Sequence, residues 1–242
     1  RPALPMGLLV DSLVQPGWIA SCLEEVVQGG DARIALIVRN QSRSLTQPSS
    51  RLSSWWRNRR HLAYALYSRL DGLRTVTRDP FEPKDLGESF AGIPVLDVLP
   101  RETRFADYVQ PEDVERIRKY DLDVVVRFGF RILRGEVLRV ARYGVWSYHH
   151  GDNRVYRGGP AGFWEVMHGD PVTGSMLQRL SEDLDGGQVL FRAWAHTIPF
   201  SVRRNRAHYY WQSAPMLAWK LRDVRRQAES GLFDAAFEKD KR

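Results

Sequence analysis

Two adjacent histidines, His149 and His150, stand at the end of a short apolar run and before an Arg-Gly-Gly-Pro loop. Three kinds of site fit such a pair: a catalytic histidine, a metal site, or a turn in which the rings are only hydrogen-bonded. A zinc site needs three or four ligands, and adjacent side chains in a strand point to opposite faces. The sequence contains no HExxH motif and only one cysteine, so we predict no metal site.

An acidic turn, SEDLDGGQVL, follows later in the chain. Its Asp185 precedes two glycines, which permit a close approach of the backbone. Acidic residues are common in ordinary turns. The turn therefore indicates a functional site only if the fold brings it to the histidine pair.

The surrounding segments predict alternating strands and helices. A strand over Met6–Ser12, a helix over Trp18–Val27 and a strand over Ala32–Asn40 form a β-α-β unit. The same criteria predict further strands over 92–98, 124–130 and 144–148, and an antiparallel pair of strands over 174–199. They also predict helices over 55–73, 109–123, 134–142, 159–169 and 208–231. The last of these helices is expected to bend before Pro215. The order predicts an α/β fold: an open, mostly parallel twisted sheet with helices on both faces, related to the Rossmann fold. Ligands of such sheets bind beyond the carboxyl ends of the strands, and His149 stands at such an end.

Composition sets further bounds. The 242 residues carry a net charge of +7, and the basic residues cluster in Arg51–Arg74 and Arg203–Arg226. Such clusters attract phosphate-bearing ligands, nucleic acid or anionic membranes, or are only solvated helix faces, and both interpretations stay open. No apolar run approaches the length of a membrane span. The single cysteine, Cys22, excludes an internal disulfide framework, so we expect a cytoplasmic protein.

The run from Arg127 to Leu190 resembles the core of the folate-dependent formyltransferases, the family of methionyl-tRNA, glycinamide ribonucleotide and sugar N-formyltransferases. The segment ILRGEVL, Ile132–Leu138, matches one motif of that family. The other matching positions, in register without a gap, are Gly144, His149, Arg157, Gly158, Pro160, Gly169, Asp170, Thr173, Gly174, Leu184, Asp185 and Gly187. The resemblance covers about residues 92–195. It implies a formyltransferase-like domain over 1–199, with a basic helical insertion at about 45–75, and a helical extension over 200–242 packed on the same domain.

The resemblance also implies roles for single residues. In the family an Asn, a His and an Asp surround the transferred formyl group, and here His149 and Asp185 take the His and Asp positions. Ser147 takes the Asn position; its hydroxyl is shorter than an amide, so His150 or Asn153 becomes a candidate for the missing donor. The resemblance places 10-formyltetrahydrofolate against Phe128, Gly129, Phe130, Ile132, Leu133, Asp183 and Leu184, and the acceptor against Asn153, Arg157 and Gly158.

We therefore expect transfer of a formyl group from 10-formyltetrahydrofolate to an amine of a small molecule, such as an amino sugar or a biosynthetic intermediate. Two alternatives remain: hydrolysis of 10-formyltetrahydrofolate, and a non-catalytic binding module on the same fold. We expect no nucleic-acid partner and no membrane span. A homodimer through the basic helix is one option.

Overall fold

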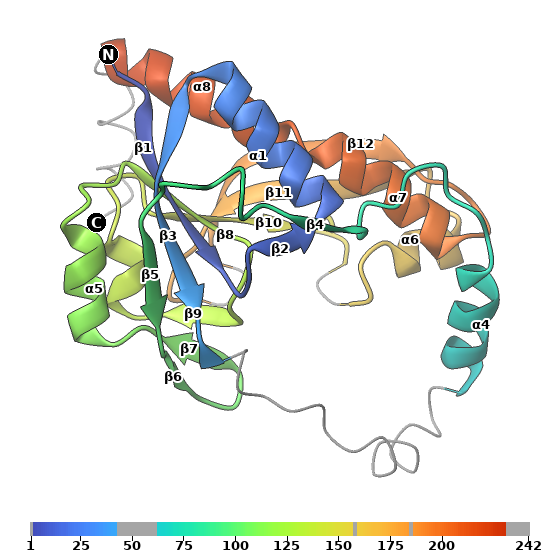
Figure 1. Cartoon of the computed structure of the whole chain (residues 1–242). Helices are drawn as coiled ribbons and strands as arrows, with labels where there is room; N and C mark the ends of the chain where they lie inside the picture. Colours follow the sequence, from blue (N-terminus) through green and yellow to red (C-terminus); the bar gives the residue numbers. More distant parts are fainter. Residues whose placement is uncertain (1, 43–61, 157–158, 184–185, 231–242) are drawn as a thin grey trace.

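The computed structural model describes residues 2–42, 62–156, 159–183 and 186–230. The strands of its main sheet are β1 (Leu4–Val10), β3 (Ala32–Asn40), β5 (Val95–Val98), β8 (Val124–Arg127), β10 (Val145–His149), β11 (Val172–Arg179) and β12 (Gln188–His196). Within the described residues their order is β12-β11-β10-β8-β1-β3-β5 (Figure 1). The five strands from β5 to β10 run parallel, and β11 and β12 continue the sheet in antiparallel register. The predicted α/β class with a mostly parallel sheet is confirmed.

The remaining elements are short strands and helices: β2 (Val14–Pro16), α1 (Gly17–Gly29), α4 (Leu62–Gly72), β4 (Pro83–Asp85), β6 (Arg101–Glu102), β7 (Ala106–Tyr108), α5 (Pro111–Arg118), β9 (Ile132–Arg134), the 3₁₀ turn η2 (Glu136–Arg139), α6 (Phe163–His168), α7 (Val202–Ser213) and α8 (Met216–Ser230). Helices α1 and α8 lie on one side of the sheet and α5 on the other (Figure 1). Each side buries its own apolar cluster, one centred on α1 and α8, the other on α5 and η2. Side chains along each strand therefore alternate between two cores.

Three predicted helices are shorter than the sequence pattern indicated. The helix expected over 109–123 is α5, which covers Pro111–Arg118. The helix expected over 134–142 is only the turn η2, because Gly135 adopts φ +85° before it and gives its N–H to the Glu182 carboxylate at 3.0 Å. The helix expected over 159–169 is reduced to α6. Ile132–Arg134, which the matched motif assigned to a helix, instead pairs with β7 as strand β9.

The predicted C-terminal helix is divided at Ala214 and Pro215 into α7 and α8. A proline has no N–H to continue the helix, and the Tyr148 hydroxyl fills the break. It donates to the Ala214 carbonyl at 3.0 Å and accepts from the Leu217 N–H at 3.0 Å. Since Tyr148 belongs to β10, this bond pair attaches the C-terminal helices to the strand that carries His149.

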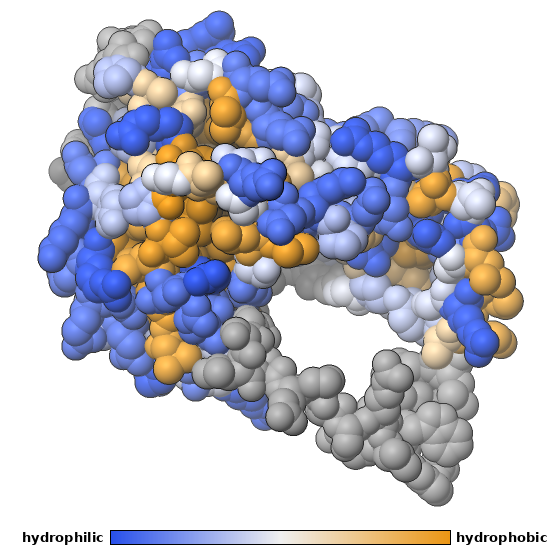
Figure 2. Space-filling view, in the orientation of Figure 1, coloured by the Kyte–Doolittle hydropathy of each residue, from blue (hydrophilic) through white to orange (hydrophobic). Residues whose placement is uncertain are grey.

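Part of the predicted basic insertion, residues 43–61, lies outside the described residues. The described part, α4, contacts the start of α7 through the buried Asp71. Its carboxylate accepts from the Ser201 hydroxyl at 2.6 Å and from the Arg203 N–H at 2.7 Å. None of the helices in the described residues is long and apolar enough to span a membrane. Apolar surface gathers toward the β5 side of the sheet (Figure 2), where this edge strand exposes Val95.

Candidate functional site

The topology creates a switch point between β1 and β8. From β1 the chain builds outward to β3 and β5, and then returns to place β8 on the other side of β1. Loops that leave the carboxyl ends of such neighbouring strands diverge and open a crevice. Arg127 ends β8, and His149 ends β10 beside it.

A cavity of about 170 Å³ opens at this position. It brings together four residues that the sequence predicted for the site: His149, Ile132, Leu133 and Asp183. The other lining residues are Arg127, Gln178, Leu180, Ser181, Glu182 and Gly187. The predicted histidine and the acidic turn therefore meet at the end of the sheet, although Leu184 and Asp185 themselves lie outside the described residues.

Ser147 is buried beside the cavity, and its hydroxyl is fully engaged. Its oxygen accepts from Nε and Nη2 of Arg127 at 3.1 and 3.0 Å. Its hydrogen goes to the Tyr148 carbonyl at 3.2 Å. The structure thus brings Ser147 next to the predicted site, held by an arginine that the sequence analysis did not single out.

His150 lies on the opposite side of the strand from His149, inside an aromatic cluster. Its ring stacks on Tyr210 with centroids 3.6 Å apart and meets the edge of Trp18 at 4.9 Å. Nε2 is 3.1 Å from the Ser213 hydroxyl, which gives its own hydrogen to the Tyr210 carbonyl. Nε2 must therefore be the donor in this pair. Burial lowers the pKa of His150 to about 3, and the charges of His149 and Arg206 act in the same direction. The structure does not bring this ring to the cavity.

The loop after β8 is held close to the end of β1. The N–H groups of Phe128 and Gly129 both donate to the Leu9 carbonyl at 2.9 Å, and the Phe130 N–H donates to the Asp11 carboxylate at 2.8 Å. A Cβ on Gly129 would lie 2.4 Å from the Asp11 nitrogen, so only glycine fits. These three predicted folate contacts shape the loop before Ile132, but none of them lines the cavity.

The predicted acceptor residues are not gathered at the cavity in the described part of the chain. The Asn153 Oδ1 accepts from the Arg192 guanidinium at 3.2 Å. Its neighbour Asp152 is bound by Arg192 and Arg154, and these arginines hold the pKa of the Asp152 carboxyl well below its usual range. Arg157 and Gly158 lie outside the described residues.

Arg127 and Gln178 are two polar cavity residues that the sequence analysis missed. Arg127 donates from Nη1 to the carbonyls of Phe130 and Arg131 at 3.3 and 2.6 Å, in addition to its bonds with Ser147. Burial lowers the pKa of its guanidinium, while the carboxylates of Asp11 and Asp107 act in the opposite direction. One signal was available: Arg127 is the charged residue in the middle of the apolar run VVVRFGF.

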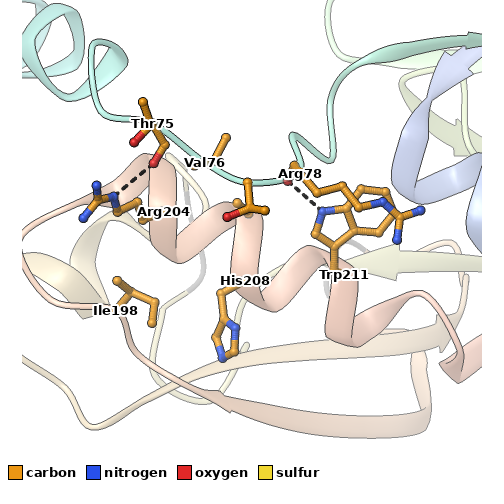
Figure 3. Close-up of a pocket in the computed structure, with 9 residues that line it drawn as sticks. Thr75, Val76, Arg78, Ile198, Arg204, His208 and Trp211 are labelled. Carbon is orange, nitrogen blue, oxygen red and sulfur yellow. Dashed lines mark hydrogen bonds between the residues drawn. The ribbon is translucent and has the colours of Figure 1, made fainter.

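Two of the other hollows in the described residues are larger than this cavity. A groove of about 890 Å³ adjoins the cavity through Leu180, Ser181 and Glu182, and its lining includes three arginines: Arg139, Arg142 and Arg179. The other, of about 580 Å³, lies between α7 and residues 75–78 (Figure 3). There Arg204 donates to the Thr75 carbonyl at 3.2 Å, and Trp211 donates to the Arg78 carbonyl at 3.0 Å. It contains none of the predicted site residues. No group of three or more His, Cys, Asp or Glu suited to a metal occurs within the described ranges.

Comparison with known proteins identifies what the chain resembles as a whole. Residues 72–203 match the formyl transferase family. Methionyl-tRNA formyltransferase of Agathobacter rectalis is 27% identical over 131 residues, which are 51% of this chain and 42% of that protein. The chain spans less than half the length of the curated relatives it matches first.

Solved structures share the fold at lower identity. Phosphoribosylglycinamide formyltransferase from Anaplasma phagocytophilum superposes with a TM-score of 0.60 and 14% identity, over 93% of this chain and 88% of that one. A formyltetrahydrofolate deformylase from Pseudomonas syringae pv. tomato superposes with a TM-score of 0.58 and 15% identity, over 93% and 62% of the two chains.

Proposed function

Because this chain belongs to the formyl transferase family, we propose that it transfers a formyl group from 10-formyltetrahydrofolate to an amine of a small-molecule acceptor. The observation that carries the proposal is the cavity at the carboxyl ends of β8 and β10. His149, which falls on the histidine of the family motif, lines this cavity together with Ile132, Leu133 and Asp183.

The proposed reaction needs a donor aimed at the formyl oxygen. The acceptor nitrogen attacks the formyl carbon, a C–N bond forms, and the carbonyl π electrons move onto oxygen. The tetrahedral adduct then collapses: the carbonyl re-forms, the bond from carbon to N10 of the folate breaks, and N10 takes a proton while the acceptor nitrogen loses one. We assign His149 as a donor to the oxyanion, which is the group that most needs stabilisation. By its position in the motif, Asp185 holds His149 or a water that relays the proton.

The proposed folate site extends over two neighbouring hollows. The small cavity, whose lining includes Ile132, Leu133 and Asp183, suits the pteridine end with its formyl group. The adjoining groove suits the glutamate part, because Arg139, Arg142 and Arg179 supply positive charge along it. Asn153, Arg157 and Gly158 remain proposed contacts of the acceptor. A homodimer also remains a proposal, which sedimentation of the purified protein would test.

Calorimetry with a hydrolytically stable analogue of 10-formyltetrahydrofolate tests the donor site. We expect Asp185→Ala to weaken binding about tenfold to a hundredfold, as for loss of a charged hydrogen-bond partner. His196→Gln is the matched control, because this exposed histidine ends β12 and does not line the cavity. A folded wild-type protein that binds no analogue would contradict the proposal.

Turnover assays then separate the possible reactions. Wild-type protein is incubated with 10-formyltetrahydrofolate and a panel of amino sugars, amino acid derivatives and aminoacyl-tRNA, and the formylated product is measured. We expect product only with an amine present, and a loss of about 10²–10³ in rate for His149→Ala. Formate release without any amine would identify a hydrolase, and analogue binding without turnover would indicate a binding module.

A further inference from the structure

Three polar residues form one row across the sheet beside His149. The register pairs Arg127 of β8 with Ser147 of β10, and Ser147 with Gln178 of β11. His149 lies two residues beyond Ser147 on the same strand, and therefore on the same face. Arg127, Gln178 and His149 all line the cavity. The row thus presents its polar groups to the place where the formyl group is proposed to lie.

The guanidinium of Arg127 is held in a fixed position with one donor to spare. Nε and one Nη2 hydrogen go to Ser147, and the two Nη1 hydrogens go to the carbonyls of Phe130 and Arg131. The fifth N–H, on Nη2, has no acceptor among the residues that the structure describes. No carboxylate of those residues lies within ion-pair distance of Arg127 either. Arg127 is partly buried, and a cation withdrawn from water without a carboxylate in direct contact favours the arrival of negative charge in the cavity.

Ser147 cannot act as the donor in place of the family Asn. Its one hydrogen is already given to the Tyr148 carbonyl, and its oxygen accepts twice from Arg127. What Ser147 does is orient the guanidinium.

We propose that Arg127 is a catalytic residue that replaces the family Asn, donating from Nη2 to the formyl oxygen, with Ser147 as its positioning residue. This inference rests on the proposed function. As the acceptor nitrogen bonds to the formyl carbon and the π electrons move onto oxygen, the arginine hydrogen bond strengthens. When the carbonyl re-forms and the bond to N10 breaks, it weakens again. Arg127 keeps its proton throughout, and the proton exchange takes place between the acceptor nitrogen and N10.

Gln178 provides independent support for a polar ligand at this place. Its Oε1 is buried and has no hydrogen-bond partner among the described residues. Buried polar atoms without partners are rare and call for an explanation. A ligand N–H in the cavity would satisfy this oxygen, in the same row that holds Arg127.

The experiment compares two folate analogues by calorimetry. One carries a trifluoromethyl ketone in place of the formyl amide and hydrates to a tetrahedral diol; the other carries a methyl ketone and stays planar. Arg127→Ala should weaken binding of the diol by about 10²–10³-fold, the usual loss for one oxyanion donor. It should leave binding of the planar analogue unchanged. Ser147→Ala should reduce the same preference for the diol. Arg116→Ala, an exposed arginine on α5, is the control and should change neither.

A second variant keeps the test decisive if Arg127→Ala does not fold. Arg127→Ala combined with Ser147→Asn removes the guanidinium and restores a carboxamide on β10, so it should regain the preference for the diol. If the folded variants lose the same factor in affinity for both analogues, or the double variant shows no preference for the diol, Arg127 is not the oxyanion donor, although the folate site stands. If wild-type protein binds neither analogue, the proposed function fails, and this inference fails with it.

Discussion

Removing the imidazole of His150 should change how stability depends on pH. The ring is buried against Tyr210 and Trp18, and burial lowers its pKa to about 3 from an ordinary 6.5. The unfolded chain therefore binds a proton at this position that the folded protein excludes between these two values. The contribution to stability is complete above pH 6.5 and is lost progressively as the pH falls toward 3.

The magnitude at pH 5 depends mainly on the unfolded chain. Each pH unit below 6.5 lowers the free energy of unfolding by about 1.36 kcal/mol for one proton. The presence of His150 should therefore lower the free energy of unfolding by about 2 kcal/mol between pH 7.5 and pH 5. His150→Phe keeps an aromatic ring in the cluster and removes the titration. It also removes the bond to Ser213, which costs about 1 kcal/mol at every pH.

Urea unfolding of both proteins at pH 7.5, 6 and 5 measures this difference. Between pH 7.5 and pH 5 the free energy of unfolding should fall by about 2 kcal/mol more for the wild-type protein than for His150→Phe. The contributions of all other titrating groups are the same in both proteins and cancel in the comparison. His196→Gln removes an exposed histidine and controls for the loss of a histidine as such. If wild type and His150→Phe lose the same free energy of unfolding, then His150 is not held neutral by burial, and its assignment to the aromatic cluster is wrong.

Three further predictions concern the scaffold. Cys22 is fully buried with its pKa raised to about 12, so a thiol reagent at pH 8 should label it only after denaturation. Tyr148→Phe leaves the Leu217 N–H without its acceptor and should lower the free energy of unfolding by about 1–3 kcal/mol in urea titrations. Gly129→Ala should cost at least about 1–3 kcal/mol and abolish binding of the folate analogue, because its Cβ would collide with the backbone after β1. Gly72→Ala is the control, because nothing lies within 4 Å of the added carbon. It should leave both the free energy of unfolding and the binding of the folate analogue unchanged.

Strands were predictable from sequence because their signal is local. The strand over Ala32–Asn40 has the predicted bounds, since continuous apolar and β-branched runs identify buried strands without further context. The turn η2 was not predictable, because its length depends on Gly135 and on Glu182 from a distant loop. The same holds for the break at Pro215, where the sequence indicated a bend but not the Tyr148 hydroxyl that fills it.

The candidate site was predictable only where a motif carried it. His149, Ile132, Leu133 and Asp183 were found through the family pattern, and they share one cavity. Arg127 and Gln178 belong to no motif, and their importance comes from strand register, which aligns residues far apart in sequence. His150 shows the reverse case: it is next to His149 in sequence, but strand alternation sends its ring to the other core.

Arg127 and Ser147 are best understood as one physical arrangement. An Asn at 147 would supply its donor directly from β10, whereas the short Ser147 supplies none and instead anchors a long side chain from β8. Both arrangements bring an N–H to the same end of the sheet, but the guanidinium adds a charge that an amide lacks. That charge favours an oxyanion more strongly than it favours a neutral carbonyl. We propose that a site on this scaffold can lose its motif residue at one strand and retain the chemistry through the neighbouring strand, since what the reaction requires is a donor at a position in space.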